Sequence, residues 1–171
     1  TKFINPSNIG QFKGKSLKVL DICFGLGYNS GLLFNQFSNN STNLNWYGLE
    51  IDRRPLEYSL KKHSIRNLWN PKVIKIFESI LAQDIFEDDF FKCKLLWGDA
   101  RTKINEIPNQ ELFDLIYLDG FSPSKCPQIW SIEFLAKVIA RLKPFGYLIT
   151  YSSSAAVRKA LLNLDLEIYN I

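Results

Sequence analysis

The feature that most constrains the fold is an alternation of short apolar runs with segments of helical periodicity. The apolar runs that we expect to be strands are Leu17–Cys23, Leu44–Leu49, Cys93–Trp97, Phe113–Leu118, Tyr147–Thr150 and Leu166–Tyr169. The segments that we expect to be helices are Asn29–Phe37, Pro55–Asn67, Pro71–Gln83, Arg101–Ile107, Trp130–Leu142 and Ala155–Asn163. The acidic stretch Asp84–Asp89 is interpreted as a turn. This alternation is typical of an α/β protein, with a mostly parallel sheet covered by helices on both faces.

Length and composition predict one folded domain. The chain has 171 residues, 46% of them hydrophobic and 22% charged, which is ordinary for a globular protein. We expect a single domain over residues 1–171, with residues 1–16 as a partly ordered N-terminal extension. The apolar runs are far shorter than the roughly 20 residues that span a bilayer. Three cysteines without a CxxC and one histidine argue against a metal site, so we expect a metal-free cytoplasmic protein with no membrane contact.

Positive charge is concentrated in the first half of the chain. Residues 1–85 carry 11 Lys and Arg against 6 Asp and Glu, whereas residues 86–171 carry 10 against 11. The candidates for contacts with nucleic-acid phosphates are Arg53, Arg54, Lys61, Lys62 and Arg66. A basic surface of this size attracts polyanions or is simply solvated, and the sequence leaves both interpretations open.

In sheets of this kind, ligands bind at the carboxyl ends of the strands. The first expected strand runs into DICFGLGYN, where Gly25 and Gly27 allow a tight turn and close approach of a ligand to the backbone. Asn29 is expected to cap the helix that follows. The loop lacks the GK[ST] of a phosphate-binding loop and the further glycine typical of dinucleotide sites. It therefore favours a nucleoside ligand without phosphates.

Each of the next three strands ends in an acidic residue. Glu50 is placed to accept from ribose hydroxyls, and Asp99 either accepts from an adenine amino group or caps the helix near Arg101. Asp119 is followed by glycine, an aromatic ring and proline; a carboxylate there can hold an amine, and the ring of Phe121 can stack on a base. Together these loops indicate an adenosyl ligand with a sulfonium, such as S-adenosylmethionine, next to an amine.

The blocks that carry a family resemblance are DICFGLGYN, GLEID, WGDAR, LDGFSPSKCPQIW and LKPFGYLITYSSSAAVRKAL. In this order they resemble the methyltransferase domain of the bifunctional tRNA 5-methylaminomethyl-2-thiouridine biosynthesis protein (MnmC) and stand-alone relatives that lack its FAD-dependent oxidase half. The resemblance runs from about Leu17 to the end of the sequence, and Leu118–Trp130 and Thr150–Arg158 are its most specific parts.

This resemblance implies a Rossmann-like class I fold and S-adenosyl-L-methionine as cofactor. It implies methylation of the aminomethyl nitrogen of a modified wobble uridine in tRNA, with tRNA as partner and a separate oxidase or tRNA-modifying protein as a further one. No flavin is expected, and the oligomeric state is left open.

The resemblance also assigns roles to residues. Those implied to bind the cofactor are Asp21, Phe24, Gly25, Gly27, Asn29, Glu50, Asp99, Ala100 and Asp119. Those implied to bind the substrate are Gly120, Phe121, Ser122 and Pro123. Asp119 and Phe121 are implied to be catalytic, and Trp130 is expected to support their loop.

Three residues depart from the family pattern. Cys23 stands at a usual glycine, Leu26 at a small polar residue and Cys126 at a common asparagine. We also expect the last, antiparallel strand of a class I sheet to be missing. Two other functions stay open: an aminopropyltransferase of the spermidine synthase type, and a non-catalytic RNA-binding module on the same fold.

Overall fold

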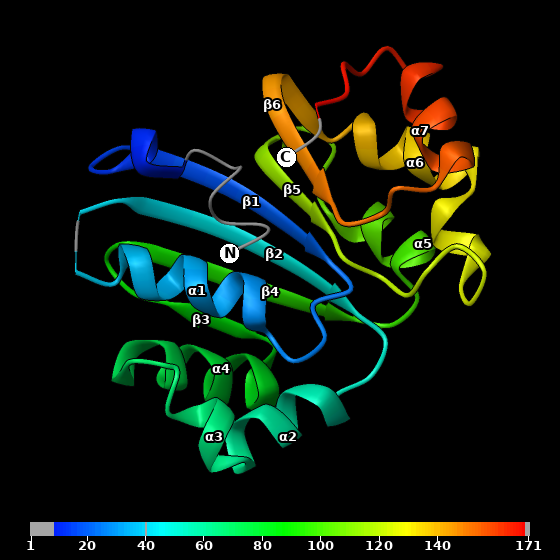
Figure 1. The fold of residues 1–171 in the computed structure, drawn as a ribbon. Helices are drawn as coiled ribbons and strands as arrows, with labels where there is room; N and C mark the ends of the chain where they lie inside the picture. Colours follow the sequence, from blue (N-terminus) through cyan, green and yellow to red (C-terminus); the bar gives the residue numbers. More distant parts are fainter. Residues whose placement is uncertain (1–8, 40, 170–171) are drawn as a thin grey trace.

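A computed structural model describes residues 9–39 and 41–169 (Figure 1). The strands are β1 Ser16–Ile22, β2 Asn43–Glu50, β3 Ile85–Glu87, β4 Phe91–Trp97, β5 Phe113–Leu118 and β6 Leu142–Thr150. The α-helices are α1 Tyr28–Phe37, α2 Arg54–Lys61, α3 His63–Arg66, α4 Pro71–Gln83, α5 Ala100–Lys103, α6 Ile132–Ile139 and α7 Ala155–Leu162. Short 3-10 helices are η1 Ile9–Phe12, η2 Ile104–Glu106 and η3 Pro127–Trp130.

The strands form one sheet in the order β3-β4-β2-β1-β5-β6. Every neighbouring pair is parallel except β3 with β4. The chain builds outward from β1 through β2 and β4, and then returns to the other side of β1 with β5 and β6. The strand order therefore reverses between β1 and β5, which is where ligands bind in such sheets.

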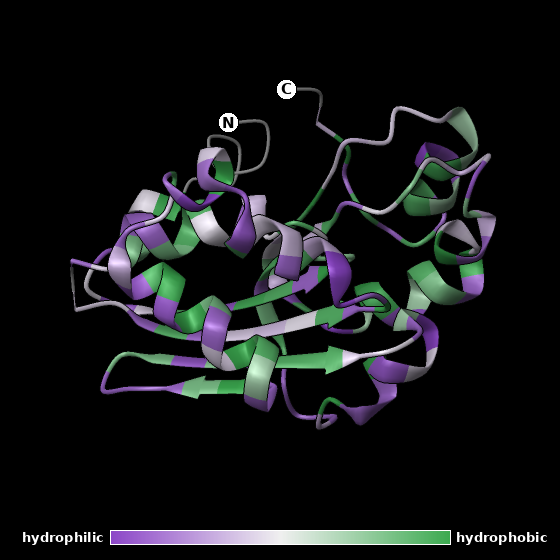
Figure 2. Cartoon of the chain, turned by 90° about the horizontal axis from the view of Figure 1, so that it is seen from below, coloured by the Kyte–Doolittle hydropathy of each residue, from purple (hydrophilic) through white to green (hydrophobic). Residues whose placement is uncertain are grey.

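Helices cover both faces of this sheet, as the alternating sequence predicts (Figure 1). On one face, residues of α1 and α4 such as Phe34 and Phe77 pack around Trp46 of β2. On the other face, α5, α6 and α7 cover a second cluster that includes Ile116 and Leu135. Figure 2 shows hydrophobic residues along the strands and on the helical turns beside them. The Rossmann-like, mostly parallel fold is confirmed.

The prediction of a sixth strand at Leu166–Tyr169 is wrong. These residues are not in a strand, although Leu166 and Ile168 pack against the second cluster. The apolar alternation here reflects side-chain packing without backbone pairing. The actual additional strand is β3, inside the stretch Asp84–Asp89 that was expected to be a turn. It pairs with β4 because the chain reverses direction after α4.

Helix boundaries also differ from those expected in several places. The expected helix Trp130–Leu142 is shorter, because α6 spans Ile132–Ile139 and Leu142 already belongs to β6, and the expected helix Arg101–Ile107 divides into α5 and η2. The segment Pro55–Asn67 divides into α2 and α3 because Lys62 is extended, and the bend brings Ile65 into the first cluster. Asn29 does not cap α1; the N-cap is Gly27, and Asn29 is the second residue of the helix. Part of the expected N-terminal extension, residues 1–8, lies outside the described residues. None of the described helices is long and apolar enough to cross a membrane.

Candidate active site

The loops after β1 and β5 meet at the carboxyl edge of the sheet. The Asp119 N–H donates to the Ile22 carbonyl at 3.2 Å. The Asn29 side chain donates from Nδ2 to Asp119 Oδ2 at 2.7 Å. The structure thus joins the glycine loop to the acidic loop, as the two sequence blocks predict.

The glycine loop, residues 23–27, takes left-handed backbone conformations at three positions. The φ angles are 66° at Cys23, 58° at Gly25 and 81° at Gly27. A Cβ atom on Gly27 would lie 2.8 Å from Phe77 and 2.9 Å from Phe24. Phe24 itself is buried and packs edge-to-face on Trp46 and Phe77, so only its backbone is available to a ligand.

Cys23 stands where the family usually has glycine, and the structure shows why glycine suits this position. Its φ of 66° is one that glycine adopts without cost and other residues adopt rarely. Its sulfur would lie 3.0 Å from a Cβ on Gly120, so the thiol fills space below the acidic loop. Burial raises the pKa of this thiol to about 12, which keeps it protonated and unreactive.

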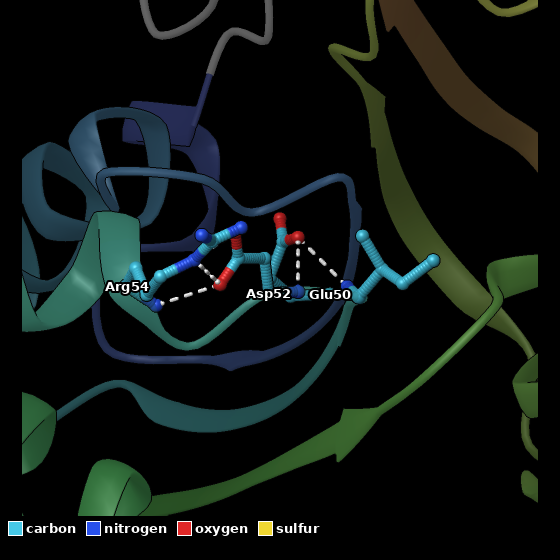
Figure 3. Close-up of polar contacts among 4 residues, drawn as sticks. Glu50, Asp52 and Arg54 are labelled. Carbon is cyan, nitrogen blue, oxygen red and sulfur yellow. Dashed lines mark hydrogen bonds and ion pairs between the residues drawn. The ribbon is translucent and has the colours of Figure 1, made fainter.

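Glu50, at the end of β2, holds two loops together, and Figure 3 shows its contacts with the residues that directly follow it. One oxygen accepts from Gly25 N–H at 2.7 Å. The other accepts from the N–H groups of Ile51 and Asp52 at 2.7 and 3.0 Å. A carboxylate has about four lone-pair sites, so Glu50 can accept from one ribose hydroxyl as it stands. It can accept from both only if Gly25 N–H is released.

Two residues that directly follow Glu50, Asp52 and Ile51, also lie at this edge of the sheet. Asp52 forms a bidentate contact with Arg54 (Figure 3), and this ion pair lowers the pKa of Asp52. Ile51 is 73% exposed, although the N–H bond to Glu50 fixes its backbone. An exposed, immobilised isoleucine beside a candidate ribose acceptor offers an apolar surface to a flat base. Sequence reasoning missed it because a single isoleucine after a strand carries no pattern.

Asp21 is a buried acid beneath the glycine loop. It is 1% exposed. Its Oδ2 accepts from Ser30 Oγ at 2.6 Å, and Ser30 Oγ accepts from Trp46 Nε1 at 2.7 Å. Oδ1 has no hydrogen-bond partner among the described residues. Burial, reinforced by the nearby carboxyls of Asp119 and Glu50, raises the pKa of Asp21 to about 7.

Asp99 caps α5, as the simpler of the two sequence interpretations predicts. Its side chain accepts from Arg101 N–H at 2.9 Å and forms an ion pair with the Arg101 guanidinium. This hydrogen bonding to Arg101 lowers the pKa of Asp99. Ala100 is buried, so its side chain is not available to a ligand.

The acidic loop, residues 119–123, presents one carboxylate and one aromatic ring. Asp119 keeps Oδ1 without a hydrogen bond among the described residues, and burial raises its pKa. Phe121 is 75% exposed. The Trp130 indole N–H donates to the Phe121 carbonyl at 2.8 Å, as the expected support of the loop requires. Tyr151, which sequence reasoning did not select, donates to the Gly120 carbonyl at 2.7 Å.

The comparison that decides the family concerns most of the chain. The model of a family described as S-adenosyl-L-methionine-dependent methyltransferase matches residues 60–170. The chain belongs to this family. Its cofactor is therefore S-adenosyl-L-methionine, as the adenosyl-type loops and acids predict.

The chain is similar to several known proteins. It is 29% identical over 168 residues to uncharacterized protein MJ0670 of Methanocaldococcus jannaschii, covering 95% of this chain and 44% of the relative. It is 28% identical over 156 residues to MnmC of Campylobacter hominis, covering 85% and 22%. The structure of MNMC2 from Aquifex aeolicus superimposes with a TM-score of 0.74 and 30% identity over 95% of this chain and 52% of that one. Human methyltransferase-like protein 13, in complex with SAH, shares the fold, at a TM-score of 0.55 and 17% identity over 92% and 64%. The chain thus spans about half or less of the first relatives it matches.

The residues at this edge fit a cationic nucleoside. The ion pairs among the described residues include none that involves Glu50 or Asp119, so a positively charged sulfonium or ammonium group would meet two carboxyl groups that no cation neutralises. The tight turn at Gly27 leaves no room for a Cβ and allows backbone contact. These carboxyl groups and the glycine turn therefore suit S-adenosylmethionine.

Proposed function

We propose that this chain is an N-methyltransferase that modifies the aminomethyl group of a modified wobble uridine in tRNA. The observation that carries the proposal is the acidic loop. It presents the unpaired Oδ1 of Asp119 beside the exposed ring of Phe121, on the strand next to the glycine loop. The chain is similar to MnmC, a tRNA 5-methylaminomethyl-2-thiouridine biosynthesis protein, and to MNMC2. This likeness supports the choice of substrate.

In this proposal, different residues at the carboxyl edge of the sheet bind different parts of the cofactor. Those we assign to it are Asp21, Phe24, Gly25, Gly27, Asn29, Glu50, Asp99, Ala100 and Asp119. Gly25 and Gly27, with the Phe24 and Ala100 backbone, face it closely, while Glu50 accepts from the ribose and Asp99 from the adenine amino group. Asn29 acts through Asp119, and the carboxyl of Asp21 lies buried beneath the glycine loop.

The chemistry asks little of the protein beyond alignment. When bound, S-adenosylmethionine would supply a methyl group on a sulfonium: in-line attack by a neutral amine would form the N–C bond, break the C–S bond and leave S-adenosylhomocysteine. Asp119 accepts a hydrogen bond from the amine N–H, and this bond orients the nitrogen lone pair toward the methyl carbon. The raised pKa of Asp119 suits it to hold the proton that the nitrogen carries after transfer.

Gly120, Phe121, Ser122 and Pro123 form the substrate side of the proposed site. Phe121 would stack on the uracil ring, because an exposed aromatic face binds flat bases well. Ser122 and Ser124 lie in hydrogen-bond contact with one another at 3.0 Å and would border the base.

Phosphate contacts are proposed at Lys61 and Lys62, around the break between α2 and α3. Of the five basic candidates, Arg53, Arg54 and Arg66 already pair with carboxylates. The other two are exposed, and no ion pair is recorded for them within the described residues. We also include in the proposal a single methyltransferase domain over residues 1–171, a cytoplasmic location and a separate partner enzyme that supplies the aminomethyl uridine.

The test is transfer of labelled methyl from S-adenosylmethionine to undermodified tRNA, followed by nucleoside analysis. We expect label in a methylaminomethyl uridine, and a loss of about 100-fold or more in kcat for Asp119→Ala. Asp89→Asn, an exposed acid after β3, is the matched control and should retain full activity. In a parallel assay with decarboxylated S-adenosylmethionine and a polyamine, methylthioadenosine as product would indicate aminopropyl transfer instead. Absence of any methyl transfer with folded protein and intact cofactor binding would contradict the proposal.

A further inference from the structure

Tyr151 lies directly after β6, beside the acidic loop. Leu118 of β5 pairs with Thr150 of β6, so the residues that follow, Asp119 and Tyr151, leave adjacent strands at the same edge. The Tyr151 hydroxyl donates to the Gly120 carbonyl at 2.7 Å. Its ring meets Trp130 edge-to-face, with 6.4 Å between ring centroids.

These two aromatic residues hold consecutive carbonyls of the loop. Trp130 donates to the Phe121 carbonyl at 2.8 Å, and Tyr151 donates to the Gly120 carbonyl. Two rings that pack on one another therefore hold both carbonyls. The two donors differ in accessibility, because Trp130 is 6% exposed and Tyr151 is 45% exposed.

The acidic loop packs on buried side chains, and its aromatic ring is exposed. Beneath it, a Cβ on Gly120 would meet Ile129 at 2.1 Å and the Cys23 sulfur at 3.0 Å, so the backbone rests directly on these side chains. Asn29 holds only one oxygen of Asp119, and the Phe121 ring is largely exposed. The Gly120 and Phe121 carbonyls belong to the two peptide planes that flank the Phe121 Cα, so these planes set the direction of the ring and hold the chain next to Asp119.

We propose that Tyr151 is a positioning residue of the methyl-transfer site: its hydroxyl fixes the Gly120 peptide so that Asp119 Oδ1 and the Phe121 ring face the same incoming nucleoside. This inference rests on the proposed function. The Tyr151 hydroxyl also occupies one of the two lone pairs of the Gly120 carbonyl, which leaves this backbone oxygen a single site for any other donor.

The test is Tyr151→Phe, which keeps the ring contact with Trp130 and removes only the hydroxyl. We expect kcat for methyl transfer to fall about tenfold or more, while the Kd for S-adenosylmethionine from calorimetry stays within about twofold. Amide hydrogen exchange should become faster in residues 119–123. The matched control is Tyr147→Phe, on β6 with 44% exposure and no side-chain hydrogen bond within the part of the chain that the structure describes, which should leave all three quantities unchanged.

Two outcomes would overturn the inference. One is a Tyr151→Phe variant whose kcat and loop exchange both equal those of the wild type. The other is a variant whose cofactor affinity falls as far as its kcat, because Tyr151 would then support the whole edge and not the acceptor loop. If the wild-type protein itself transfers no methyl to the nucleoside, the proposed function fails, while hydrogen exchange still tests the restraint on the loop.

Discussion

Asp21 shows how a single buried residue links the site to the stability of the fold. Its carboxyl is shielded from water, and its pKa is raised to about 7 in the folded chain. An unfolded aspartate titrates near 3.9. Between these values the folded chain binds a proton that the unfolded chain has released. Folding is therefore favoured most at low pH in this window, and the contribution of Asp21 to stability is lost as pH rises toward 7.

Asp21→Asn should remove this dependence, because the amide is uncharged and can still accept from Ser30. Between pH 4 and 8 the wild type should lose up to about 4 kcal/mol relative to the variant. Urea denaturation of both proteins across this range measures the difference. Asp89→Asn is the control at an exposed position and should follow the wild-type curve. Parallel curves for the wild type and Asp21→Asn would show that the buried carboxyl does not titrate in this range.

Gly27→Ala tests the glycine loop without touching a charge. The φ of 81° is strained for alanine, and the new Cβ would overlap the rings of Phe77 and Phe24. We expect a loss of about 2–4 kcal/mol in unfolding free energy, measured by thermal or urea denaturation. Gly10→Ala, where no atom lies within 4 Å of the new Cβ, should change stability by less than about 0.5 kcal/mol. Equal effects at the two positions would contradict this account of the loop.

Among the elements, the turn between α6 and β6 is tied to the segment before β5 by a buried arginine. Arg141 is 8% exposed. Its guanidinium donates to the carbonyls of Pro108, Ile107 and Ile104 at 2.7, 3.0 and 3.2 Å. It forms no ion pair among the described residues, so these backbone carbonyls and the Asn109 side-chain oxygen, at 3.3 Å, compensate its charge. The clamp joins two elements that approach the sheet from one face.

Arg141→Ala should lower the unfolding free energy by about 3 kcal/mol, since several buried carbonyls lose their donor. Arg141→Lys should recover only part of this loss, because an ammonium cannot span acceptors arranged for a planar fork. Denaturant unfolding of both variants supplies the comparison. Lys137→Ala, exposed one turn earlier in α6, is the control and should stay within about 0.5 kcal/mol of the wild type. A similar result for Arg141→Ala would rule out a stabilising clamp.

Elements with local signals were predictable from the sequence. Helix α4 begins and ends as expected because Asn70 caps it, accepting from Val73 N–H at 3.0 Å, and Pro71 follows at the first position. Strand β3 was not predictable, since its three residues form a strand only through pairing with β4, a contact that no local pattern encodes. The same reason explains why Leu166–Tyr169 is not a strand: alternation predicts which side chains are buried, not which backbone they pair with.

The candidate site follows the same division. The acids at the strand ends were found because each directly follows an apolar run. The competition at Glu50, which already binds Gly25 N–H, could not be predicted, because it depends on how closely two loops approach. Tyr151 had a signal in its position directly after an expected strand, but its hydrogen bond to Gly120 exists only in three dimensions.

At the scale of the whole molecule, the cofactor should stabilise the fold. Its proposed contacts connect the loops after β1, β2, β4 and β5, which come from both halves of the chain, so binding acts on the folded state alone. At 100 times its Kd, S-adenosylmethionine should add about 2.7 kcal/mol to the unfolding free energy. A thermal denaturation series with this ligand measures the effect, and ATP at the same concentration is the control. An equal shift with ATP would contradict recognition of a nucleoside without phosphates.

The outermost strand β6 has a consequence for how the protein behaves at high concentration. Among the described residues its one strand neighbour is β5, and an edge strand of this kind can associate with a second molecule unless its backbone is irregular. Pro144 carries no N–H, Phe145 turns its backbone to a φ of 63°, and the pairing register with β5 shifts before Tyr147. These irregularities leave only Tyr147–Thr150 as a regular edge segment. This segment is too short to nucleate an extended intermolecular sheet.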